Sequence, residues 1–143
     1  MSTKGTATAY KNICMVTAIV RIVIGMVALF FACFIASEVK NGTGALVILF
    51  PVGVYSLVDG VIKLVKSYVS GQTYLEVYED RFVGTGMQGM KALSFNIAFS
   101  GVHNVCVERK FWLHICASGG TYKVMTNEKT AAEVCEYFTR IKG

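Results

Sequence analysis

Two long apolar segments, joined by a short polar turn, dominate the first half of the chain. The first segment covers residues 13–36 and the second covers residues 45–65. Each exceeds the roughly 18 apolar residues at which a membrane-spanning helix is the default interpretation. The pattern predicts a transmembrane helical hairpin over residues 12–70, with helices at about 12–37 and 44–68. A loose cytosolic tail of residues 1–11 precedes it.

The hydrophobic period changes from that of a helix to that of strands at Thr73. Short alternating segments follow, separated by turn residues at positions 79–80, 100–101, 109–111 and 119–120. The three glycines at positions 84, 86 and 89 are assigned to a strand end and a loop that reaches residue 92. We therefore expect about six short antiparallel strands.

The last predicted hairpin allows its register to be tested. If residues 119 and 120 form a two-residue turn, Ile115 opposes Val124 and Ala117 opposes Tyr122, apolar against apolar. Asn127 then caps a final helix over residues 128–141, in which apolar residues recur at helical spacing. The predicted fold class is an α+β membrane protein: the hairpin precedes a small antiparallel β-barrel or bent sheet, over residues 72–143, with a C-terminal α-helix.

Composition and charge agree with a membrane segment. The chain is 54% apolar and 16% charged, and its net charge is +5. Residues 1–72 carry +4 of that charge and residues 73–143 carry +1, so the positive-inside bias explains the surplus better than nucleic-acid binding does. Lys and Arg flank the outer ends of both helices, which predicts that both termini are cytoplasmic. Asn41-Gly42-Thr43 matches a glycosylation sequon, but Asn-Gly is also turn chemistry, which we favour.

Arg21 and Asp59 are the charges deepest in the two apolar segments. Counted from the turn, each lies at nearly the same depth, because a helix rises about 1.5 Å per residue. We expect an ion pair between them; the alternatives are a pair with another membrane protein and a conducting role.

Small residues form a stripe on each predicted helix at helical spacing. Such stripes let membrane helices approach closely. The stripe residues assigned to helix packing are Ala18, Gly25, Ala28 and Ala32 in the first helix and Gly53, Ser56 and Gly60 in the second.

The second half resembles bacterial PH-like domains, which often follow a two-helix membrane hairpin. The resemblance rests on FNIAFS at 95–100, VHNV at 102–105, LHI at 113–115, YKV at 122–124 and the last helix. It implies a PH-like barrel, a tendency to oligomerise and no catalytic residues. The first hairpin loop departs from lipid-binding PH domains, because Tyr78-Glu79-Asp80-Arg81 is not basic, which disfavours phosphoinositide binding.

Residues with metal-ligating side chains gather only at His103, Cys106, His114 and Cys116. The register places Cys106 opposite His114, but His103 has no route to join them, so we predict packing rather than zinc binding. A Cys106–His114 nucleophile would lack a third, orienting group. The five cysteines form no CxxC motif, and we predict free thiols, no catalytic residues, no metal and no cofactor.

An aromatic and basic hairpin tip is predicted at Arg109, Lys110, Phe111 and Trp112. It either contacts a membrane interface or a partner, or covers one end of the barrel. The leading hypothesis is a non-catalytic interaction or scaffold module at the inner face of the bacterial cytoplasmic membrane. Its partners would be the bilayer and an unidentified protein or a second copy of the chain. A lipid or small-ligand sensor that uses the barrel mouth, and a pore-forming or toxin-like hairpin, are the alternatives.

Overall fold

The computed structural model describes residues 1–41 and 43–143. Gly42, which belongs to the predicted turn and to the sequon, lies outside the described residues. The chain forms two compact units: residues 13–65, and residues 1–12 together with residues 66–143. The first unit is the body of a helical hairpin, and the second is built around a β-sheet.

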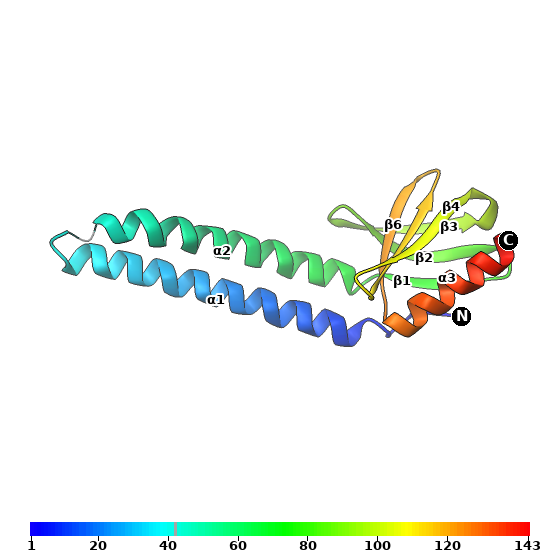
Figure 1. Cartoon of the computed structure of the whole chain (residues 1–143), viewed down its shortest axis with the longest axis horizontal. Helices are drawn as coiled ribbons and strands as arrows, with labels where there is room; N and C mark the ends of the chain where they lie inside the picture. Colours follow the sequence, from blue (N-terminus) through cyan, green and yellow to red (C-terminus); the bar gives the residue numbers. More distant parts are fainter. Residues whose placement is uncertain (42) are drawn as a thin grey trace. The chain divides into compact units, whose positions relative to one another are not determined.

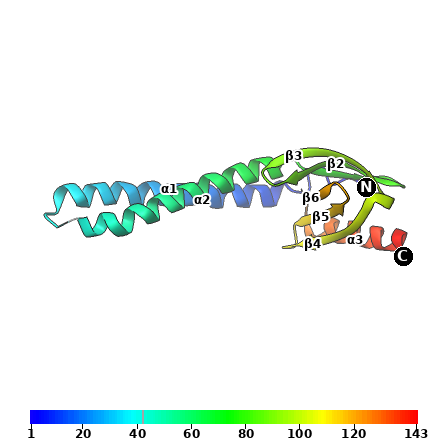
Figure 2. The ribbon, with the colours of Figure 1, turned by 90° about the horizontal axis from the view of Figure 1, so that it is seen from above.

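Helices α1 (Thr8–Glu38) and α2 (Thr43–Ser70) run side by side in opposite directions (Figures 1 and 2). Both are long and apolar enough to cross a membrane. Their apolar side chains are mostly exposed, as for Phe30 and Val47, of which 68% and 71% remain accessible. A two-helix unit with this surface requires an apolar environment or a large apolar partner.

The second unit contains one antiparallel sheet and a C-terminal helix, α3 (Glu128–Lys142). The strands are β1 (Tyr74–Val77), β2 (Arg81–Gln88), β3 (Lys91–Ala98), β4 (Val102–Glu108), β5 (Trp112–Ala117) and β6 (Gly120–Met125). The strand order is β1-β2-β6-β5-β4, and β3 pairs with β2. A 3-10 turn, η1 (Phe99–Gly101), connects β3 to β4.

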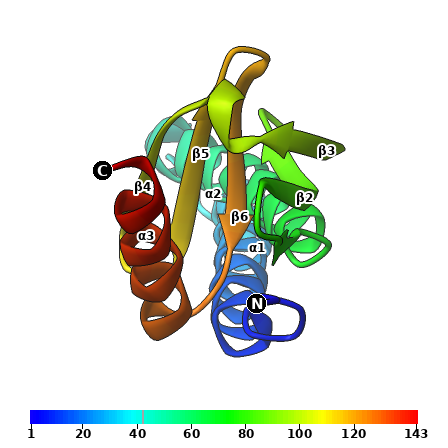
Figure 3. The same cartoon turned by 90° about the vertical axis from the view of Figure 1, so that its right-hand side faces the viewer.

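The sheet is open, so the predicted barrel is wrong in its closure and the bent sheet is what forms. One residue pair, Met87 with Lys123, joins β2 to β6. In Figure 3 the β2–β3 hairpin runs across the direction of β5 and β6. Since η1 separates β3 from β4 and no ladder joins these two strands within the described residues, the ring is not completed.

The last hairpin differs from its predicted register by two residues. Ala117 pairs with Gly120, Ile115 with Tyr122, and Leu113 with Val124, so Ser118 and Gly119 form the turn. A shift of two leaves each side chain on its predicted face, because strand side chains alternate. Gly120, with φ of +122°, adopts a backbone conformation that suits only glycine.

Gly84 and Gly86 lie inside β2 rather than in a loop. A Cβ at Gly84 would collide with the carbonyl oxygen of Tyr74, and a Cβ at Gly86 would lie 2.8 Å from the Cβ of Tyr122. The glycines therefore permit close approach of neighbouring strands, and the turn to β3 is confined to Gly89 and Met90. The strand β3 consequently begins at Lys91, earlier than the sequence pattern indicates.

The core lies between the sheet and α3, which packs against β4 (Figures 2 and 3). The fully buried residues include Phe82, Leu113 and Val134. The predicted N-cap is confirmed: Asn127 Oδ1 accepts a hydrogen bond from the Thr130 N–H at 2.7 Å. Strand alternation and helical spacing would place Val107 and Ile141 inward, but both are exposed, because Val107 lies near the end of an edge strand and Ile141 lies in the last helical turn.

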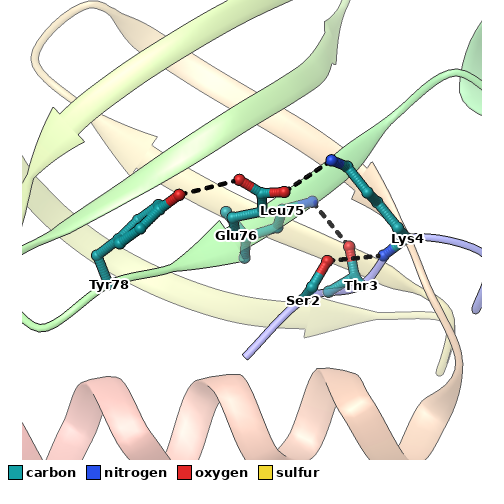
Figure 4. A network of polar contacts seen from close by, with 6 residues as sticks. All are labelled: Ser2, Thr3, Lys4, Leu75, Glu76 and Tyr78. Carbon is teal, nitrogen blue, oxygen red and sulfur yellow. Dashed lines mark hydrogen bonds and ion pairs between the residues drawn. The ribbon is translucent and has the colours of Figure 1, made fainter.

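Residues 1–7 are not a free tail, contrary to the sequence prediction, and α1 begins at Thr8. Val77 N–H donates to the Met1 carbonyl at 2.8 Å, and Thr3 N–H donates to the Leu75 carbonyl at 2.8 Å. Leu75 N–H donates to Thr3 Oγ1 at 2.7 Å (Figure 4). Residues 1–3 thus cover the outer edge of β1, and backbone pairing explains why so polar a segment is ordered.

Candidate functional site

Arg21 and Asp59 contact each other between the two helices of the hairpin. Arg21 Nη1 donates to Asp59 Oδ2, and Lys63 Nζ lies 2.9 Å from the same oxygen, one helical turn along α2. The structure therefore brings together a three-residue cluster with one negative and two positive groups. The sequence singled out the first pair but did not assign Lys63 to it. One carboxylate that accepts from two cations satisfies costly charges within an apolar segment.

The predicted small-residue stripes lie largely at the helix interface. Ala18, Gly25, Ala32, Gly53 and Gly60 are buried, whereas Ala28 and Ser56 are half-buried. A Cβ at Gly25 would lie 2.8 Å from the Leu57 backbone nitrogen, and one at Gly60 would lie 3.1 Å from the Ala18 carbonyl oxygen. The glycines thus set the separation of the helices, since any larger residue would push them apart.

The predicted aromatic and basic tip is only partly free. Phe111 stacks on Tyr10 with ring centroids 4.8 Å apart, and its carbonyl accepts from the Thr126 N–H at 2.9 Å. Arg109 and Lys110 both have positive φ, +52° and +67°, which is uncommon for residues with a side chain. Lys110 Nζ lies 3.7 Å from a Glu128 carboxylate oxygen. The contacts of Phe111 and Lys110 within the same unit fix the tip in place.

Arg109 and Trp112 line a cavity of about 240 Å³ on the sheet. Its walls are formed by Lys66, Met87, Glu108, Arg109, Trp112, His114 and Lys123. These residues come from the last turns of α2, from β2, β4, β5 and β6, and from the β4–β5 tip. Basic side chains at such separated positions give no local sequence motif, so the sequence by itself does not group them. Their opposing positions on paired strands could have been found only with the correct register.

His114 lies in that cavity wall, opposite Lys123 on one side and Cys106 on the other. Burial is the main cause that lowers the pKa of His114, and the charge of Lys123 lowers it further, whereas Glu108 acts in the opposite direction. His114 Nε2 lies 2.9 Å from Glu108 Oε2, but the alignment is not that of a hydrogen bond, and Nε2 is buried without a partner among the described residues. A neutral imidazole is consistent with this setting.

The candidate metal ligands do not converge. His103 lies at a β-bulge between Val102 and Asn104, away from the His114–Cys106 pair. No group of three or more His, Cys, Asp or Glu side chains suitable for a metal ion occurs within residues 1–41 and 43–143. The five cysteines are free thiols, and burial raises the pKa of Cys135, which keeps that thiol protonated at neutral pH.

The N-terminal segment also carries a surface ion pair. Lys4 Nζ lies 2.7 Å from Glu76 Oε1 on β1, and the Tyr78 hydroxyl donates to Glu76 Oε2 at 3.2 Å (Figure 4). Hydrogen bonding to Lys4 lowers the pKa of Glu76 and raises that of Lys4. These exposed contacts align the segment, while the buried Thr3 provides its firmer attachment.

Comparisons of this chain with models of protein families, with curated proteins and with solved structures find no match. What the structure shows is two helices that could span a membrane, an open antiparallel sheet and a C-terminal helix.

Proposed function

We propose that this protein is a membrane-anchored, non-catalytic interaction module that presents the free edge of β3 to a protein partner. The observation that carries the proposal is the difference between β3 and the other outer strands of the sheet. A strand edge without a neighbour exposes backbone donors and acceptors that an extended segment of another chain can pair with.

The edge of β1 is covered, and the edge of β4 is partly covered. Residues 1–3 hydrogen-bond along β1, as described above. Along β4, Lys142 Nζ on α3 donates to the carbonyl oxygens of Val102 and His103, and Cys135 Sγ donates to the Val105 carbonyl at 3.7 Å. Within the described residues, β3 has a backbone ladder with β2 alone.

The side chains of β3 leave its edge accessible. Leu93, Ser94 and Asn96 are exposed, the strand contains no proline, and its one charged residue is Lys91 at its start. Edge strands that must avoid pairing usually carry charges, a proline or a bulge. The β3 edge lacks these protections along seven of its eight residues, which favours strand addition by a partner.

The hairpin would supply the location. The distribution of Lys and Arg favours both termini and the sheet unit on the cytoplasmic side, and the resemblance to bacterial PH-like domains favours a bacterial cytoplasmic membrane. The partner is another protein or a second copy of the chain, and the resemblance to bacterial PH-like domains, which tend to oligomerise, favours the second copy. In either case recruitment requires no catalytic group.

Site-specific photo-crosslinking in membranes tests the proposal. A photoreactive amino acid at Ser94 on β3 should give a discrete adduct with a partner or a second copy. The same amino acid at Ala132, an exposed residue of α3, is the matched control and should not. Asn96→Lys should suppress the adduct, whereas Ala132→Lys should leave it unchanged. Equal crosslinking from both positions, or none from Ser94, would refute the β3 interface.

Membrane location needs its own measurement. The full chain should sediment with membranes and resist extraction by alkaline carbonate. Thiol labelling of Ser118→Cys, in the β5–β6 turn of a variant whose five native cysteines are replaced by serine, should require access from the cytoplasmic side. Labelling of this position in intact cells by an impermeant reagent would show that the orientation is wrong.

A further inference from the structure

A basic cavity lies on the face of the sheet opposite to α3. Leu113 and Ile115 point to the core beneath α3, so the alternating residues Trp112 and His114 point to the other face. This face continues across the neighbouring strands β2, β6 and β5, because Met87 pairs with Lys123 and Lys123 pairs with His114. The residues of this row form the floor of the cavity.

Three cations reach the cavity from different elements. Lys66 comes from the last turns of α2, Lys123 from β6, and Arg109 from the β4–β5 tip. Arg109 is exposed, and its backbone has a positive φ of +52° at the β4–β5 tip. Glu108 is the one acidic residue in the lining, which leaves a formal charge of +2 with a neutral His114.

Trp112 adds an indole side chain to the lining of the same cavity. Its indole N–H can donate a hydrogen bond and cannot accept one, which complements an anion. With Lys and Arg side chains around it, the lining offers donors that suit the several acceptor oxygens of a phosphate group. The volume of about 240 Å³ is that of a small polar group, not of a nucleotide or an acyl chain.

We propose that this cavity binds a phosphate group, carried either by a small soluble phosphate or by the headgroup of an anionic phospholipid. The inference is independent of the proposed β3 interface, which involves none of these residues. Lys66 directly follows the apolar segment of α2, a position that brings its ammonium group near phospholipid headgroups if α2 spans a membrane. The two sources present the same chemistry and are separated by experiment.

Trp112 is the single tryptophan of the chain, so its fluorescence reports on the cavity directly. The full chain in detergent is titrated with inorganic phosphate and, separately, transferred to nanodiscs of phosphatidylcholine with or without phosphatidic acid. A saturable change with inorganic phosphate supports a soluble ligand. A change confined to the phosphatidic acid nanodiscs supports a headgroup.

Matched variants assign the effect to the cavity. Lys66→Gln and Lys123→Gln should each weaken binding about tenfold in the arm that responds, since each removes a charge-assisted hydrogen bond. Glu108→Gln should tighten it, because a repelling carboxylate is lost. Lys129→Gln on α3 is the control with the same charge change and should have no effect. Lys66 is exposed, so its variant stays informative even if Lys123→Gln perturbs the sheet.

Three results would overturn the proposal. The first is the absence of a fluorescence change in both arms. The second is a change that neither lysine variant weakens. The third is equal weakening by Lys129→Gln and Lys66→Gln, which would show a general effect of protein charge.

Discussion

The two units of this protein bury their apolar residues in opposite ways. In the hairpin, burial is concentrated at small residues such as Gly25 and Ala32, while large side chains such as Phe30 and Ile24 face outward. In the sheet unit, large side chains such as Phe82 and Leu113 are fully buried. The hairpin thus gains contact by close backbone approach, and the sheet unit gains it by removing apolar area from water.

This difference predicts where substitutions matter. A large-to-small change should be costly in the sheet unit and mild on the hairpin, whereas a small-to-large change should be costly between the helices. The charges differ as well: the hairpin gathers Arg21, Asp59 and Lys63 in one cluster and carries Glu38 and Lys40 near its turn, whereas the sheet unit keeps most of its charges exposed.

The largest effect is expected for Phe82→Ala, which leaves a cavity in contact with Phe99 and Phe138. The free energy of unfolding should fall by about 3–5 kcal/mol. Denaturation of the full chain in detergent, followed by Trp112 fluorescence, measures it. Phe30→Ala on the outer face of α1 is the control and should change this value by less than about 1 kcal/mol. Similar losses from both would remove the contrast between the units.

Charge reversal at Asp59 should have the next largest effect. Asp59→Arg places three cations together in an apolar segment, and Arg21→Asp leaves two carboxylates there, so each should sharply reduce the yield of membrane-inserted protein. The double reversal should restore much of that yield. The yield is measured by quantitative blotting of membrane fractions. A double variant no better than the singles would show that the contact of Arg21 with Asp59 does not stabilise the hairpin.

Gly25→Val should separate the helices, because its side chain would meet the backbone of α2. We expect a loss of about 1–3 kcal/mol of helix association, by analogy with overpacked cores. Pulsed electron paramagnetic resonance between spin labels on α1 and α2 measures the increased distance. Gly44→Val is the control, since no atom lies within 4 Å of a Cβ added there. An unchanged distance in the Gly25 variant would mean that α1 and α2 do not pack through this glycine.

Thr3→Val tests the attachment of the N-terminal segment. It keeps the side-chain shape but removes the acceptor for the Leu75 N–H, which should cost the sheet unit about 1–2 kcal/mol. Hydrogen exchange of the Leu75 amide should accelerate in parallel. Thr8→Val, at an exposed position, is the matched control. If Leu75 exchange stays slow in the Thr3 variant, residues 1–3 do not protect β1.

The smallest effect concerns pH. The pKa of His114 is lowered in the folded state from its ordinary value of 6.5, so the unfolded chain takes up a proton first as the pH falls. Stability of the sheet unit should be fully present above pH 6.5 and decline as the pH falls from 6.5 toward the folded pKa. Thermal unfolding of the full chain at several pH values measures the decline, and His114→Gln should remove that component. A pH profile identical in both proteins would exclude His114 as its source.

The local pattern of apolar and polar residues was sufficient to predict the helices and strands and, for most of them, which face points to the core. Period alone separates helical residues 13–65 from the strands that follow, and Asn127 marks the start of α3. This pattern was insufficient to fix the strand register residue by residue, as in the β5–β6 turn. There, two glycines permitted either of two registers with the same faces, and pairing between strands decided between them.

The sequence by itself determined that this chain has an apolar helical hairpin, an antiparallel sheet and an amphipathic last helix, because each depends on periodicity within a segment. Only the tertiary structure decided that the sheet stays open, that residues 1–3 cover β1, that Lys63 joins Asp59, and that Lys66, Arg109 and Lys123 line one cavity. Each of these depends on residues far apart in the chain or on a choice of strand partner. No local pattern encodes such contacts, because backbone and charged groups can be satisfied by many alternative neighbours until the fold selects one.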